Sequence, residues 1–128
     1  MLLGAHLAGC AIENSMLGAA HACANPLTAH YGIVHGHAVG VMLPHVVRFN
    51  SEDGQRPYGD LGIDPKALVE RLGHFLAVAG IPGKLREHGV RESSLDEMAE
   101  EASRQWTATF NPRQVGVSEL RALYQSAM

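Results

Sequence analysis

Apolar residues recur at steps of three and four positions along most of this chain, the period of an α-helix with one buried face. The first pattern runs through Leu3, Leu7, Leu17 and His21 and predicts one helix over residues 2–22. Similar patterns predict further helices over residues 35–49, 65–79, 95–106 and 119–128. No alternation typical of half-buried strands occurs, so we expect an all-α bundle with residues 1–128 as a single domain.

Local signals mark several of the expected helix starts. Asp64 followed by Pro65 is an N-cap followed by the first helical position. Ser94 and Glu97 have the spacing of a capping box, and Ser118 can cap the last helix. The helix over residues 2–22 starts with no capping residue before it, which favours a piece of a longer chain.

The apolar stripes also predict which side chains face the core, and Asn111-Pro112-Arg113 reads as a turn with Arg113 as a surface or capping charge. On the three later helices the expected inward residues are Leu68, Leu72, Phe75, Leu76, Leu95, Met98, Ala99, Ala102, Trp106, Leu120, Leu123 and Tyr124.

Candidate chemistry gathers in residues 21–37, which contain four histidines: His21, His30, His35 and His37. A proline and several glycines punctuate this stretch, so it is not expected to be one continuous helix. Two elements should therefore meet here, each offering an imidazole, the commonest protein ligand for first-row metals.

The position of Asn25 before Pro26 has a purely structural interpretation, because this pair is typical of a helix start. In that interpretation Asn25 only caps a short helical turn over residues 26–31. Cys23, His30, His37 and Glu13 are possible further metal ligands, but none has a compelling spacing to the others. Cys23 is better explained as a small packing residue, since free cysteines are commonly buried.

Several motifs stand in one order along the chain: Leu17-Gly18-Ala19-Ala20-His21, Asn25-Pro26-Leu27, His35-Gly36, Leu43-Pro44-His45-Val46 and, near the end, Asn111-Pro112-Arg113. In this ordered set the chain resembles the iron-containing alcohol dehydrogenase family, specifically its all-helical C-terminal domain. The resemblance covers nearly all of the 128 residues.

The resemblance implies a divalent metal, typically iron (Fe²⁺) and sometimes zinc (Zn²⁺), bound by one Asp and three His. Two of those His match His21 and His35 here, and the other two ligands precede this chain in the family. Many members carry a His for proton transfer four residues after the first metal His, and Asn25 stands there. Asn25 is thus the candidate catalytic position, although an amide does not titrate near neutral pH and is a poor proton relay.

The family's NAD(P)-binding α/β domain has no counterpart here, because no Gly-rich phosphate loop occurs. The net charge of −3 and the lack of a basic stripe argue against nucleic-acid binding. Two cysteines do not make a disulfide scaffold. No membrane span or positively charged signal region is present, so a cytoplasmic location is the default expectation.

These features favour the metal-binding half of an NAD(P)-dependent, iron-type alcohol dehydrogenase that acts on small alcohols or aldehydes and is inactive alone. One alternative is a non-catalytic helical remnant or interaction module. Another is one half of a split enzyme that docks a separate nucleotide-binding partner. We also expect self-association, because a surface that faces a missing domain would expose apolar area.

Overall fold

The computed structural model describes residues 2–52, 54 and 56–128, and over these residues it contains helices, turns and loops without any strand. The all-α fold expected from the sequence is therefore confirmed. None of the helices in the described ranges is both long and apolar enough to cross a membrane. In chain order the elements are α1 (Leu2–Ser15), α2 (Ala19–Tyr31), α3 (His35–Asn50), η1 (Gly59–Leu61), α4 (Pro65–Val78), η2 (Leu85–His88), η3 (Glu92–Ser94), α5 (Leu95–Ser103), η4 (Trp106–Phe110) and α6 (Val117–Ala127).

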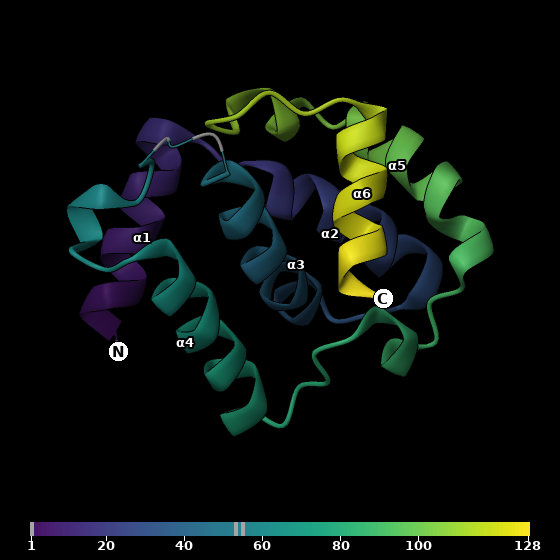
Figure 1. The fold of residues 1–128 in the computed structure, drawn as a ribbon, viewed down its shortest axis with the longest axis horizontal. Helices are drawn as coiled ribbons and strands as arrows, with labels where there is room; N and C mark the ends of the chain where they lie inside the picture. Colours follow the sequence, from purple (N-terminus) through teal and green to yellow (C-terminus); the bar gives the residue numbers. More distant parts are fainter. Residues whose placement is uncertain (1, 53, 55) are drawn as a thin grey trace.

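Helix α2 lies in the middle of the molecule, where it packs against α3, α5 and η4 (Figure 1). Its buried face consists mostly of small side chains: Ala19, Ala20, Ala22, Cys23, Ala24, Pro26 and Leu27. Small side chains let neighbouring helices approach closely, so α2 can be surrounded on several sides. The larger core residues come from the surrounding helices and include Met42, Leu95, Met98, Leu120 and Tyr124.

The helix starts expected at residues 35, 65 and 95 are found where the sequence indicates them, although the last of these helices ends at Ser103 and not at residue 106. Helix α3 begins at His35 and ends at Asn50, one residue later than expected. Helix α4 begins at Pro65, and the Asp64 carboxylate accepts hydrogen bonds from the backbone N–H groups of Lys66 (2.9 Å) and Ala67 (3.4 Å). These ends are set by contacts within three residues, which explains why local signals predict them.

The single helix expected over residues 2–22 is wrong. Helix α1 ends at Ser15 because Met16 adopts a left-handed conformation (φ 65°), and α2 starts only at Ala19. None of the described residues of α1 is buried, and Leu3 and Leu7 are 71% and 58% exposed. Figure 1 shows α1 at the edge of the molecule, so its apolar side chains are not part of the internal core.

The helix start expected at Asn25-Pro26 is also wrong, because Pro26 lies inside α2. A proline inside a helix has no N–H to donate, and its ring crowds the carbonyl four residues earlier, which loosens the local hydrogen bonding. The buried Tyr124 hydroxyl donates to the carbonyl oxygen of Cys23 at 2.7 Å, next to this weakened turn. A side chain from α6 thus supports α2 where its own ladder is disturbed.

Three smaller expectations are corrected as well. Phe75 and Trp106 point outward, at 58% and 60% exposed, while the other expected core residues of α5 and α6 are buried. Ser94 makes no cap hydrogen bond, since its hydroxyl donates to the Arg91 carbonyl oxygen at 2.7 Å. Helix α6 starts at Val117, one residue before Ser118, after the N-cap Gly116.

Candidate metal centre

His21 and His35 come from the beginnings of two consecutive helices. His21 is the third residue of α2, and His35 is the first residue of α3. His21 lies about 15 Å along the α2 axis from Tyr31, at about 1.5 Å per residue. The four links from Tyr31 to His35 span up to about 14 Å, so the connection can lead His35 back along α2 toward His21.

The connection between the helices has features that favour such a return. Gly32 ends α2 in the left-handed region (φ 63°), and its N–H donates to the Thr28 carbonyl oxygen at 3.0 Å. Ile33 is buried and joins the core cluster, whereas Val34 is 62% exposed. The link is therefore anchored between the two helices, which fixes where α3 begins.

The structure brings the two imidazoles together, with ring centroids 5.5 Å apart and ring planes at 50°. A first-row metal lies about 2.1 Å from a coordinating nitrogen and so about 3.2 Å from the ring centroid; two rings on a tetrahedral metal would then have centroids about 5.2 Å apart. The observed separation is close to this value. The distance between the His21 and His35 rings is therefore compatible with two ligand positions of one divalent metal.

The protonation state of His21 also suits a ligand. His21 is half-buried, and burial, followed by the nearby His35, lowers the pKa of its imidazole below the ordinary value of 6.5. A lowered pKa keeps the ring neutral near pH 7, and only the neutral ring has a lone pair for a metal. His35 is exposed, so the pair opens to the surface on one side.

The other candidate ligands do not join this pair. Cys23 is fully buried, and burial raises the pKa of its thiol to about 12, as suits a packing residue. His30 instead pairs with Glu101, with Nε2 and Oε2 2.9 Å apart. Over the residues that the structure describes, no group of three or more His, Cys, Asp or Glu side chains is arranged to hold a metal.

Asn25 lies one helical turn after His21 on α2. It does not act as an N-cap, because its Nδ2 donates to the Oε1 atom of Gln105 at 2.9 Å. This bond uses a donor of the Asn25 amide, and the Oδ1 atom of the same side chain can still accept. Sequence reasoning missed Gln105, since nothing in its local context points to a residue 80 positions away.

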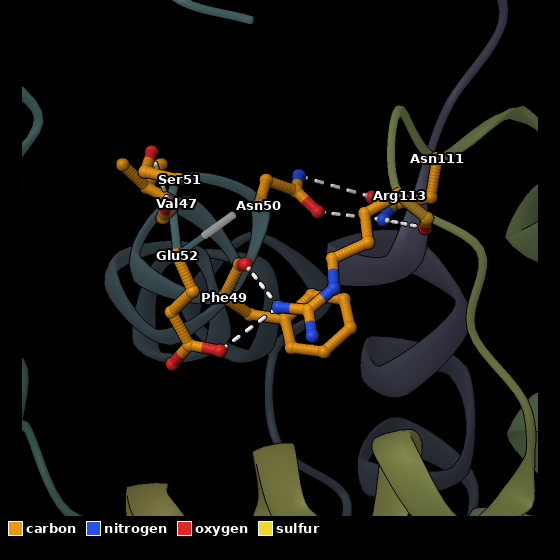
Figure 2. Close-up of polar contacts among 7 residues, drawn as sticks. All are labelled: Val47, Phe49, Asn50, Ser51, Glu52, Asn111 and Arg113. Atoms are coloured by element: carbon orange, nitrogen blue, oxygen red, sulfur yellow. Dashed lines mark hydrogen bonds and ion pairs between the residues drawn. The ribbon is translucent and has the colours of Figure 1, made fainter. Parts of the chain in front are cut away.

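A second polar cluster, also missed from the sequence, surrounds the turn at Asn111–Arg113 (Figure 2). The Arg113 Nη1 atom donates to the Phe49 carbonyl oxygen at 2.7 Å and to Glu52 Oε2 at 2.8 Å. The guanidinium carbon lies 3.9 Å from the centre of the Phe49 ring. Of the two roles expected for Arg113, the capping charge is thus confirmed, because it binds a carbonyl of the last turn of α3. Beside it, the amides of Asn50 and Asn111 are buried.

Comparison with known proteins places these features in a family context. A family model for the C-terminal region of Fe-containing alcohol dehydrogenases matches residues 1–128. The chain is 32% identical to the lactaldehyde reductase of Escherichia coli (strain K12), over 99% of this chain and 37% of that protein. It is 33% identical to the 1,3-propanediol dehydrogenase of Citrobacter freundii, over 94% of this chain and 35% of that protein. The chain therefore spans about a third of the length of these curated relatives.

Solved structures give a matching result. A 1,3-propanediol oxidoreductase superposes with a TM-score of 0.80 and 30% identity, over 88% of this chain and 33% of that chain. An iron-containing alcohol dehydrogenase from Thermococcus thioreducens superposes with a TM-score of 0.75 and 30% identity, over 88% and 32% of the two chains.

Proposed function

Because the chain belongs to the Fe-containing alcohol dehydrogenase family, as its C-terminal domain, we propose that it is the metal-binding part of an NAD(P)-dependent alcohol dehydrogenase. In this proposal His21 and His35 are two ligands of one divalent metal, with iron as the first choice and zinc as the alternative. The observation that supports it most directly is the approach of the two rings to a centroid separation of 5.5 Å.

The chemistry assigned to the site follows from the donors present. A divalent metal held there would supply Lewis acidity toward the oxygen of an alcohol or aldehyde, and NAD(P) bound by another domain would supply the hydride chemistry. In this proposal His21 and His35 hold the metal. The Asn25 Oδ1 atom accepts a hydrogen bond from the hydroxyl group of the substrate. Asn25 is thus the proposed catalytic residue by position, as a hydrogen-bond acceptor rather than a proton relay.

The proposed substrates are small alcohols and aldehydes. The similar proteins are named as a lactaldehyde reductase and a 1,3-propanediol dehydrogenase, and both names describe small oxygenated molecules. The substrate of this chain belongs, in our proposal, to the same class.

Two ligands are too few for catalysis, since catalytic metal sites generally have about three protein ligands plus solvent. We therefore propose that residues 1–128, as a single domain, are inactive alone. The remaining ligands and the NAD(P) site would come from a nucleotide-binding domain, in the same polypeptide or in a separate one.

A non-catalytic interaction module is the second candidate. It is favoured by α1, whose described residues all lie outside the core and whose Leu3 and Leu7 are largely exposed. In that case α1 mediates self-association or docking, and the histidine pair has no metal to bind. Metal binding therefore separates the two candidates.

Calorimetric titration of the chain with Zn²⁺, and with Fe²⁺ under anaerobic conditions, tests the proposal. Parent protein should bind one metal weakly, because solvent must fill the positions that the two imidazoles leave open. His21→Ala and His35→Ala should each remove most of the binding. Binding should also fade below about pH 6.5, the ordinary pKa of histidine, as protons compete for the rings.

His74→Ala and His88→Ala are the matched controls, since both positions lie on other helices of the chain. His74 is exposed, and His88 Nε2 is already paired with the Pro82 carbonyl oxygen at 2.9 Å. These variants should bind metal like the parent. If His21→Ala binds as tightly as the parent, the metal site is refuted and the interaction module gains support.

A further inference from the structure

Two buried amides, Asn50 at the end of α3 and Asn111 in the turn before α6, form a reciprocal pair (Figure 2). Asn111 Nδ2 donates to Asn50 Oδ1 at 2.7 Å, and Asn50 Nδ2 donates back to Asn111 Oδ1 at 3.3 Å. The two residues are only 2% and 9% exposed. A buried amide that loses its partner is left unsatisfied, so each side chain fixes the orientation of the other.

The pair also holds other segments of the chain. Asn111 Nδ2 donates to the Arg113 carbonyl oxygen at 2.6 Å, and Asn50 Nδ2 donates to the Tyr58 hydroxyl at 2.8 Å. Most importantly, Asn111 Oδ1 accepts a hydrogen bond from the backbone N–H of Ala19 at 3.3 Å. We call these contacts of Asn50 and Asn111 the amide clamp.

The bond to Ala19 stabilises a helix start that has no N-cap side chain. Ala19 is the first residue of α2, and its N–H is one of the donors that a helix leaves without an internal partner. The N-cap residue is Gly18, which has no side chain to cap the N–H groups of the second and third helical residues. A β-carbon at position 18 would lie 3.2 Å from Asn111 Oδ1, so the glycine leaves room for the distant amide.

The clamp acts on the two helices that carry the histidine pair. Ala19 precedes His21 by two residues, and Asn50 is the last residue of the helix that begins at His35. The first turn of α2 is therefore tied to the far end of α3. Metal–nitrogen distances tolerate deviations of only about 0.2 Å, so a small shift of that turn would disturb the pair.

We propose that Asn111 is a positioning residue, which holds His21 at ligand distance from His35 by tethering the first turn of α2 to Asn50. This inference rests on the proposed metal-binding function. It assigns a role to the Asn111-Pro112-Arg113 turn, which otherwise lies outside the metal centre. Arg113 supports the tether, because its bond to the Phe49 carbonyl oxygen holds the same turn against α3.

The test compares Asn111→Ala with the parent by Zn²⁺ calorimetry and by the nuclear Overhauser effect between the His21 and His35 ring protons. The variant should bind Zn²⁺ about tenfold more weakly, the scale on which supporting residues act on metal sites. The ring-to-ring signal of the metal-free protein should weaken as well. Leu123→Ala, a core truncation on α6, is the control that lowers thermal stability without changing either readout.

A double variant separates positioning from simple capping. Gly18→Ser in the Asn111→Ala background supplies a local cap for α2 but no tether to Asn50. We expect this double variant to have a higher melting temperature than Asn111→Ala, while its Zn²⁺ affinity stays as low as that of Asn111→Ala. Full recovery of affinity by Gly18→Ser would overturn the proposal, as would an Asn111→Ala protein with parental affinity and an intact ring signal.

Two remaining outcomes are also decisive. If the parent binds no Zn²⁺, the proposed function fails, and the ring-to-ring signal alone decides whether Asn111 holds the two histidines together. If Asn111→Ala does not fold, Gly18→Ala takes its place. The added methyl group crowds Asn111 Oδ1, so Gly18→Ala should weaken Zn²⁺ binding by a smaller factor than the one expected for Asn111→Ala. An unchanged Zn²⁺ affinity together with an unchanged ring-to-ring signal would count against the tether.

Discussion

Replacing Tyr124 by phenylalanine should destabilise the protein by about 1 kcal/mol, the usual net contribution of a buried hydrogen bond. The hydroxyl is inaccessible to solvent and donates to the Cys23 carbonyl oxygen at 2.7 Å. That carbonyl lies three residues before Pro26, where the ring loosens the hydrogen bonds of α2. Water cannot reach the site to replace the lost donor, so the Cys23 carbonyl should lose one hydrogen bond without compensation.

Urea unfolding followed by far-UV circular dichroism measures this loss. The midpoint should fall with an unchanged slope, and the melting temperature should drop by about 3–6 °C for a domain of this size. Tyr31→Phe is the matched control. The Tyr31 hydroxyl bonds Ser94 Oγ at 2.6 Å and is only partly buried, so water can replace it and the loss should be smaller. A Tyr124→Phe loss below about 0.5 kcal/mol, the low end for a hydrogen bond, would refute the reasoning.

Further predictions concern pH, thiol chemistry and association. Burial, with help from nearby cations, lowers the pKa of His45 to about 4. As pH falls, the unfolded protein should therefore bind this proton at a higher pH than the folded protein does. About 1–2 kcal/mol of stability, a value reduced to allow for the partial exposure of His45, should be present above pH 6.5 and lost as pH falls toward 4. The fall in the urea midpoint between pH 7 and pH 4.5 should be smaller in His45→Asn than in the parent, and an equal fall in the two proteins would contradict this. Ellman's reagent should modify the exposed Cys10 in the native protein and the buried Cys23 only after denaturation; two fast native thiols would argue against the burial of Cys23. Leu3→Glu with Leu7→Glu should reduce self-association in sedimentation velocity without loss of helix signal, and unchanged association would place the contact elsewhere.

Helix starts could be predicted from the sequence where nearby residues determine them. Asp64 caps α4 through backbone groups two and three residues away, so a local rule suffices. The region from residue 16 to residue 26 behaves differently. The apolar period continues through Met16, whose left-handed backbone has no signal in the pattern. Pro26 is tolerated inside α2, and Tyr124, the residue that supports this turn, stands 101 positions from Cys23.

Apolar periodicity also predicted helices better than it predicted burial. Phe75 and Trp106 have the right spacing for an inward face but are mostly exposed. A periodic pattern shows that a helix has an apolar side, whereas burial requires a neighbour to cover that side. On α5 and α6 such neighbours exist, and Met98, Leu120 and Tyr124 are fully buried.

The histidine pair shows which properties of a site depend on local sequence and which depend on distant contacts. His21 and His35 could be singled out from sequence because their residue type, their spacing and the breaks between them are all local features. The two rings approach each other even though the helix boundary before His21 was wrong, since each histidine needs only to stand on its own element. The distance between the rings depends instead on how the first turn of α2 sits against α3, and the bond that ties down this turn comes from Asn111, 92 positions away from Ala19. The residue types of the pair are thus local features of the sequence, whereas the distance between the rings is set by the fold. It follows that substitutions at the histidines should abolish metal binding, while substitutions in the amide clamp should weaken it by a graded factor.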